Sequence, residues 1–185
     1  MVPFSRLLAA LADVPDPRRA QGKRYPLPYL LLFTVLALLS GGRSYRGIIT
    51  FLDQRRDHLN RHFGVDLKRA PALNTLRHVL QTLDTPALEK VLRRHAKGLL
   101  QEPAAGERTA IALDGKVLRG SFDHIYDRKA AQTLTAFASD AAIVLAHTEI
   151  DDKSNEIPAA QQMIRDLGLT GVLFTADAMH CQKNI

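Results

Sequence analysis

The spacing of apolar residues changes once along this chain, near residue 100, and that change limits the folds open to it. Before residue 100, apolar side chains recur every three or four residues, which is the spacing of one helix face. The first such set is Phe4, Leu7, Leu8 and Leu11. After residue 108, apolar residues instead form short runs of strand length. The sequence therefore predicts an α/β protein in two parts.

Four further helices are expected in the first part: the apolar run after Pro28 that ends at Gly41-Gly42, and residues 45–63, 74–83 and 85–99. Gly41-Gly42 and Gly64 are typical helix ends, whereas Ser44, Asn74 or Thr75, and Thr85 are typical helix starts. The most apolar stretch, residues 27–39, is much shorter than the roughly 20 residues of a membrane-spanning helix. We therefore predict a buried helix and no membrane segment.

The second part is predicted to be a mixed sheet. Strands are expected at residues 109–113, 133–138, 141–150 and 172–175, with a hairpin turn at Ser139-Asp140. A helix capped by Ser154 or Asn155 runs to Leu167 and precedes the last strand. The order β-β-β-α-β makes this helix a crossover. Residues 101–107 are the expected linker, which gives a helical domain over 1–100 and a sheet domain over 108–185.

The net charge differs between the two parts. Residues 1–107 hold 17 Lys and Arg against 9 Asp and Glu, a net charge of +8, whereas residues 108–185 hold 8 against 10, a net charge of −2. A basic unit joined to a slightly acidic one favours a protein that holds a polyanion with its first part. Ordinary solubilising charge is the alternative. The expected phosphate-contacting surface of the first part is a turn-rich loop with Arg18, Arg19, Lys23 and Arg24. It also includes Arg43, Arg46, Arg55 and Arg56, with solvated helix faces as the alternative for some of them.

Two aspartates stand at the expected ends of apolar strands. Asp114 follows Ile111-Ala112-Leu113, and Asp177 follows the last predicted strand. If these strands are parallel neighbours, about 5 Å apart, both carboxylates project from one edge of the sheet, where ligand sites of α/β sheets gather. Carboxylate pairs of this kind suit Mg²⁺ or Mn²⁺. Taken singly, an aspartate at a strand end is most often a turn residue or a helix cap.

Cys181 is the single cysteine, so an internal disulfide is excluded and a reducing compartment is expected. No secretory signal pattern opens the chain. We therefore predict a cytoplasmic protein.

Three ordered motifs resemble the H-repeat-associated group of bacterial insertion-sequence transposases. They are Asp114–Ser121, Lys153–Ile157 and Thr175–Lys183, and the segments Val14–Arg19 and Leu83-Asp84 are similar to the helical domain of that group. The resemblance implies a ribonuclease-H-like catalytic domain that uses an Asp-Asp-Glu triad with Mg²⁺ or Mn²⁺. It also implies double-stranded DNA, at element ends and target, as the partner, and a nucleoid-associated location. A homo-oligomer is left open.

The resemblance makes Asp114 the first acid of the triad and Asp177 the second. The glutamate of the family lies well downstream of the second acid, and the sequence printed here stops at Ile185. We therefore expect a transposase whose cleavage and strand-transfer site is incomplete within these residues, so activity of this chain alone is left open. The alternatives are a DNA-binding fragment without catalysis and an unstable remnant of a transposase. Lys116, Arg119 and Lys153 are further expected DNA contacts, with solvated loop charge as the alternative.

Overall fold

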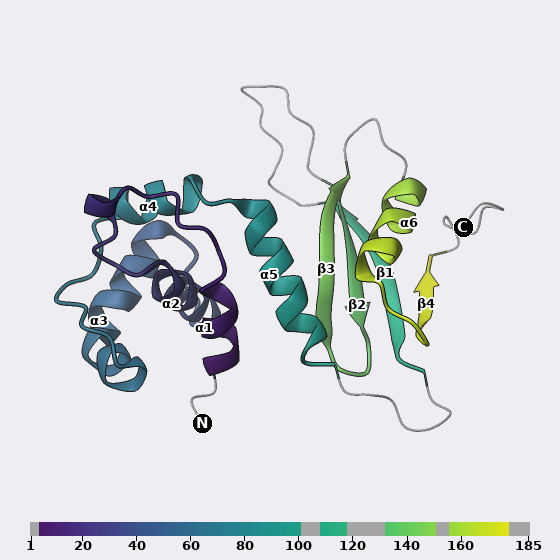
Figure 1. The fold of residues 1–185 in the computed structure, drawn as a ribbon, viewed down its shortest axis with the longest axis horizontal. Coiled ribbons are helices and arrows are strands. Elements are labelled where there is room, and N and C mark those ends of the chain that lie inside the picture. Colours follow the sequence, from purple (N-terminus) through teal and green to yellow (C-terminus); the bar gives the residue numbers. More distant parts are fainter. Residues whose placement is uncertain (1–3, 101–107, 118–131, 151–155, 178–185) are drawn as a thin grey trace. The chain divides into compact units, whose positions relative to one another are not determined.

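A computed structural model describes residues 4–100, 108–117, 132–150 and 156–177 of the chain (Figure 1). These residues form two compact units, Met1–His95 and Ala96–Ile185. The contact boundary lies inside a helix, whereas the predicted linker at 101–107 lies outside the described residues. The domain limits 1–100 and 108–185 therefore stay predictions.

The first unit is helical, as its apolar spacing predicts. Its helices are α1 (Ser5–Leu11), α2 (Leu27–Leu39), α3 (Tyr45–Phe63), α4 (Leu73–Gln81) and α5 (Thr85–Lys97), with a short 3₁₀ helix at Ala20–Gly22. Ser44 caps α3 as expected, because its hydroxyl accepts the N–H of Gly47 at 3.1 Å. Gly64 ends α3 in the left-handed conformation, with φ of 65°.

Two helix starts differ from the prediction. Helix α4 begins at Leu73, after Ala72, rather than at Asn74 or Thr75. At the start of α5, the Asp84 carboxylate accepts the N–H of Ala87 at 3.0 Å, so Asp84 provides the side-chain cap in place of Thr85. Aspartate and threonine are both suitable capping residues, so the sequence alone did not separate Asp84 from Thr85, the next residue along the chain.

Helix α2 forms the centre of the first core. Leu32, Phe33 and Ala37 are fully buried, and the packing around them includes the aromatic ring of Phe63. A helix that is apolar on nearly all sides needs such an enclosed position, which confirms the prediction of a buried helix. Among the residues that the structure describes, no helix has the length and apolar character needed to cross a bilayer.

The second unit is a mixed four-stranded sheet with one helix, in the predicted order β-β-β-α-β. Its elements are β1 (Ala110–Val117), β2 (Gln132–Ala138), β3 (Ile143–Ile150), α6 (Glu156–Leu167) and β4 (Leu173–Ala176). The strand order is β3-β2-β1-β4. Strand β2 is antiparallel to both β1 and β3, whereas β4 is parallel to β1. The mixed α/β fold predicted from the sequence is therefore confirmed.

The two faces of the sheet differ in burial. On one face, Ile111 and Leu113 of β1 pack with Leu134 of β2 in a core that includes Met163 and Leu167 of α6. Helix α6 contacts β2 and β3 on this side (Figure 1). Because side chains alternate along a strand, the neighbours of these residues point to the other face. Asp114, one of the two acidic residues predicted from the sequence, lies on that second face.

Candidate functional site

Asp114 lies inside β1 rather than after it. The sequence predicted a strand that ends at Leu113, but β1 continues to Val117 because β2 pairs with this whole stretch. Asp114 therefore faces away from α6, on the opposite side of the sheet from Leu113. Its side chain is 54% exposed. The carboxylate is thus held by a regular strand and remains open to solvent.

Asp177 follows directly after β4, as predicted. The parallel pairing of β1 with β4 ends with Leu113 opposite Ala176, so the next residues along the same register are Asp114 and Asp177. Asp177 itself lies outside β4, so it is one residue beyond the last printed pair; a continued register would put the two carboxylates about 5 Å apart. Asp177 is exposed, like Asp114. The parallel neighbours that the sequence required are present, and the shared metal site stays a prediction.

Lys116 lies two residues beyond Asp114, on the same face of β1. Its ammonium Nζ is 2.9 Å from Oδ2 of Asp114. Both side chains are more than half exposed, so the pair adds little to the free energy of unfolding. The effect of the pair is local, because Lys116 places a positive charge next to the Asp114 carboxylate. Arg119 and Lys153, the other expected DNA contacts of this part, lie outside the described residues.

Sequence reasoning missed two side chains in the row of Asp114. Thr135 on β2 pairs with Asp114, and His147 on β3 pairs with Thr135. His147 therefore lies about 10 Å from Asp114, two strand spacings away, on the same face. Pairing residues outward from the Ser139-Asp140 turn would predict which residue of β3 lies opposite Thr135. A bulge between Ala136 and Phe137 shifts the β2–β3 register, so that simple count gives the wrong partner. Among the described residues, no three His, Cys, Asp or Glu side chains gather into a metal-binding group.

Arg18 was expected to contact DNA, but its side chain is buried inside its own loop. Its side chain is only 4% exposed, and its guanidinium makes two hydrogen bonds of 2.8 Å with the Asp16 carboxylate. It also donates to the carbonyl oxygens of Tyr25 at 2.7 Å and Gly22 at 3.1 Å. The side-chain hydrogen bond from Arg18 lowers the pKa of Asp16 below 3.8, against the opposing effect of burial. Arg18 therefore holds the loop in shape.

The remaining basic residues of this loop point outward. Arg19, Lys23 and Arg24 are exposed. The Arg24 guanidinium carbon lies 5.9 Å from the centroid of the Tyr25 ring, within the range of a cation–π contact. The loop thus presents three cations on a backbone that Arg18 fixes from within. Whether these cations contact DNA stays a prediction.

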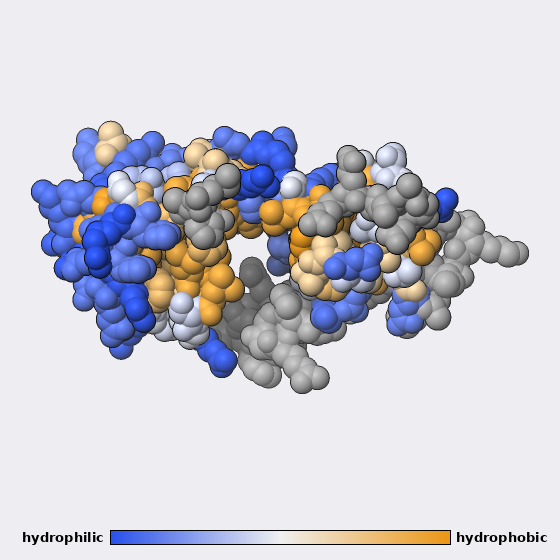
Figure 2. All heavy atoms as spheres, turned by 90° about the horizontal axis from the view of Figure 1, so that it is seen from below, coloured by the Kyte–Doolittle hydropathy of each residue, from blue (hydrophilic) through white to orange (hydrophobic). Residues whose placement is uncertain are grey.

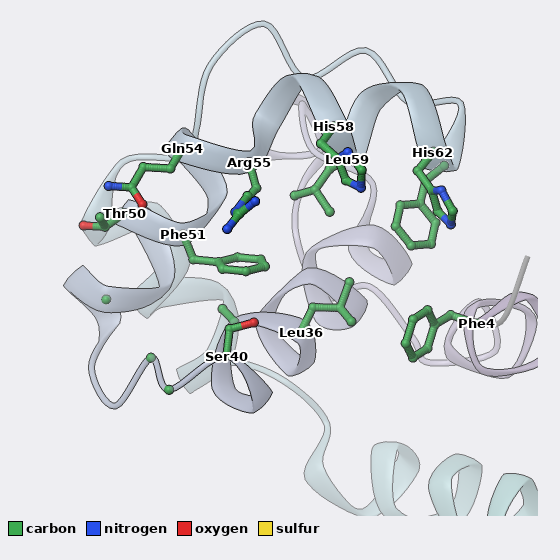
Figure 3. A pocket seen from close by; sticks show the side chains of 15 residues that line it. Phe4, Leu36, Ser40, Thr50, Phe51, Gln54, Arg55, His58, Leu59 and His62 are labelled. Carbon is green, nitrogen blue, oxygen red and sulfur yellow. The ribbon is translucent and has the colours of Figure 1, made fainter.

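The helical unit also contains a cavity of about 660 Å³ (Figure 3). Phe51 of α3 and Leu36 of α2 form apolar parts of its wall, and Arg55, His58 and His62 of α3 surround it. The imidazole rings of His58 and His62 are nearly parallel, at 6.0 Å between centroids. Neither Asp114 nor Asp177 lines this cavity, so it is separate from the two predicted acids. Hydrophilic residues cover much of the visible surface of this unit (Figure 2).

Comparison with known proteins identifies the family. A family model described as DDE_Tnp_1-associated matches residues 8–96, which is the helical unit with the start of the next. The protein named "Putative transposase YncI" of Escherichia coli strain K12 is 32% identical over 179 residues, covering 97% of this chain and 71% of its own length. This chain belongs to the H-repeat-associated transposase family.

Other relatives are also named as putative transposases. "H repeat-associated putative transposase YbfD" of the K12 strain is 29% identical over 98% of this chain and 70% of its own length. The YncI protein of E. coli O157:H7 is 32% identical over 97% of this chain, but the match covers 45% of that protein. The chain thus spans about half the length of several curated relatives that it matches. No solved structure matches it.

Proposed function

We propose that this member of the transposase family supplies the DNA-binding helical unit and two acids of a metal-dependent site that cleaves and rejoins DNA strands. The sheet unit would correspond to a ribonuclease-H-like catalytic core. The observation that carries the proposal is the parallel pairing of β1 with β4, which ends at Leu113 and Ala176, the residues just before Asp114 and Asp177. Because several curated relatives are about twice as long as the stretch they share with this chain, the proposal is stated for a longer protein of that length that contains these residues.

The two acids fit a divalent cation by their chemistry. Two carboxylates about one strand spacing apart repel each other unless a cation lies between them. Their oxygens are hard ligands, and Mg²⁺ is commonly bound by one or two carboxylates together with phosphate oxygens and waters. Lys116 is the present counter-ion of Asp114, at 2.9 Å, and a metal ion would take its place at this carboxylate. A third acid would complete the set from another part of the longer protein.

When bound there, a divalent cation would activate the attacking oxygen and stabilise the leaving oxygen of a phosphodiester. The residues of this chain would contribute the rest of the arrangement. Asp114 and Asp177 would orient the scissile phosphate by fixing the position of the cation. Lys116, once displaced from Asp114, would donate to a phosphate oxygen. The regular pairing of β1 on both sides would keep the first acid in place.

The helical unit would hold the DNA. Residues 1–95 contain 16 Lys and Arg against 7 Asp and Glu, a net charge of +9. Arg19, Lys23 and Arg24 extend from a loop whose conformation Arg18 fixes, so they would meet the phosphates with little loss of backbone entropy. Backbone contacts of this kind give affinity that falls with salt and carry little sequence information.

A strand-nicking assay tests the proposal in the longer protein, with a supercoiled plasmid that carries the element ends. We expect nicking with Mg²⁺ or Mn²⁺, and no nicking when Asp114→Asn or Asp177→Asn is introduced. Both variants should still shift a labelled duplex in a gel, since the helical unit is unchanged. Asp140→Asn is the matched control, because Asp140 lies exposed in the β2–β3 turn of the same unit.

Nicking that persists at the wild-type rate in both variants would refute the role of the two acids. Salt-sensitive binding without nicking in the unaltered longer protein would leave only the DNA-binding half of the proposal. Loss of both binding and nicking in the Asp140→Asn control would indicate unfolding, and thermal melting of each variant identifies that case.

A further inference from the structure

A second cavity in the helical unit lies between the basic loop and the segment that leads into α4. Its volume is about 370 Å³. Arg24, Gln21 and Tyr25 line it from the loop, and Arg69 and Thr75 line it from the other side. None of the lining residues is acidic. Two guanidinium groups from parts of the chain 45 residues apart therefore share one cavity.

Hydrogen bonds hold the loop wall of this cavity. The hydroxyl of Tyr25 donates a long, weak hydrogen bond of 3.4 Å to the carbonyl oxygen of Ala70 on the opposite wall. Arg18 fixes the loop from within by its hydrogen bonds to the carbonyl oxygens of Gly22 and Tyr25. Tyr25 is 7% exposed, so its ring forms part of the first core. Arg24 thus extends from a backbone that is tied on both sides.

The opposite wall is held from α3. The amide group of Asn60 makes two hydrogen bonds with the backbone of Leu67, to its carbonyl oxygen at 3.2 Å and from its N–H at 3.0 Å. Arg56 adds a weaker hydrogen bond of 3.4 Å to the carbonyl oxygen of Lys68. Arg69 is the next residue along this tied segment. The cavity is therefore formed before any ligand binds.

Arg24 and Arg69 have no counter-ion in the described part of the chain. Both are exposed, and no described carboxylate forms an ion pair with either. Cations that share a cavity without a negative partner favour an anion between them. Guanidinium groups match the geometry of phosphate oxygens. The Thr75 hydroxyl and the Gln21 amide provide further hydrogen-bond donors to such an anion.

We propose that Arg24 and Arg69 together hold a single phosphate of the DNA backbone in this cavity. The inference rests on the DNA-binding half of the proposed function and gives it a defined contact. A water molecule takes up about 30 Å³ in the liquid, so the cavity has room for a phosphate with parts of its sugars. A DNA phosphate is favoured over free phosphate because the whole unit carries a net charge of +9, which attracts a polyanion far more than a small ion.

The test is duplex binding by this chain, measured by fluorescence anisotropy at several salt concentrations. We compare Arg24→Gln, Arg69→Gln, the double variant, and Lys90→Gln as the control. Lys90 is an exposed cation of α5 in the same unit, outside the cavity, so it removes the same charge. Thermal melting of each variant confirms folding, which exposed arginines should not disturb.

Each single arginine variant should weaken binding on the order of tenfold, as expected for the loss of a hydrogen bond between charged groups. Because both arginines hold the same phosphate, the loss in the double variant should be smaller than the product of the single losses. The slope of log affinity against log salt should become shallower by about one in the double variant, the value for one phosphate. Lys90→Gln should bind nearly as the unaltered chain does.

Two results would overturn the inference. Losses that multiply, with a slope shallower by about two, would indicate separate phosphates for the two arginines. Single variants that bind as Lys90→Gln does would indicate no phosphate site in the cavity. Thermal melting of the same variants with inorganic phosphate distinguishes a DNA phosphate from free phosphate as the bound anion. If phosphate stabilises the unaltered chain but not the arginine variants, and no duplex binds, the DNA assignment fails together with the proposed function.

Discussion

Arginines of the same loop have different roles in the folded chain, and the sequence alone does not show which arginine is buried and which is exposed. Arg18, Arg19 and Arg24 all read as phosphate contacts, yet the first is buried against Asp16 while the others are exposed. The sequence could not separate them, because the backbone carbonyls that Arg18 binds are set by the folded turn. The four strands were easier to predict, since they follow from apolar runs, whereas Asp114 lies inside β1 and not at its predicted end.

Replacing Arg18 with alanine should lower the free energy of unfolding by about 2–3 kcal/mol, because Asp16 and two carbonyl groups lose their donor in a partly buried place. Urea denaturation followed by circular dichroism measures the change. Arg19→Ala is the matched control and should stay within about 0.5 kcal/mol of the unaltered chain. Equal effects of the two substitutions would contradict the structural role of Arg18.

The Asp16–Arg18 pair should also make stability depend on pH. The pKa of Asp16 is lowered in the folded chain from 3.8, so the folded state favours the ionised carboxylate. This contribution is fully present above the unfolded pKa and is lost as pH falls through the lower folded pKa. Asp16→Asn should therefore be less stable than the unaltered chain at pH 6, and the difference should shrink below about pH 4. A difference that stays constant with pH would contradict this assignment.

At the scale of elements, local pattern predicted the helices and the order of elements along the chain but not where β1 ends. Helical spacing and the glycine and serine ends located α2 and α3. Strand β1 continues through Asp114 and Lys116 because β2 pairs with them, and no local feature of those polar residues announces that pairing. The row that joins Asp114 to Thr135 and His147 depends on the same long-range register, with its bulge.

The end of α3 offers a clean test of local backbone geometry. Gly64 has φ of 65°, and a Cβ placed there would meet no atom within 4 Å. Gly64→Ala should therefore lower the free energy of unfolding by about 1 kcal/mol through the left-handed backbone alone. Gly22→Ala is the control, since its Cβ would make only an ordinary contact of 3.6 Å with Cβ of Arg18. Thermal melts that place Gly64→Ala at or above the control would contradict this reading.

At the scale of the whole molecule, the chain has two separate cores. The buried residues of the first core all lie between Leu11 and Val91, and those of the second lie between Ile111 and Leu167. Each unit therefore buries its own apolar surface, as an independently folding domain does. Composition predicted this division, because the net charge and the apolar spacing both change near residue 100.

A fragment of residues 1–100 should therefore fold by itself. We expect a helical circular dichroism spectrum and a single cooperative thermal transition, because no described residue of the second core contributes to the first. The fragment should also retain most of the salt-dependent duplex binding of the chain, since it holds the excess positive charge. A broad, non-cooperative melt would show that the first unit depends on the second.

The proposal that Asp114 and Asp177 share one divalent cation can be tested by Mn²⁺ titration, with electron paramagnetic resonance reporting the free ion. We expect one Mn²⁺ site in this chain, weakened on the order of tenfold or more by Asp114→Asn and equally by Asp177→Asn. Asp140→Asn should leave the site unchanged. Equal Mn²⁺ affinity in all four proteins would contradict the claim.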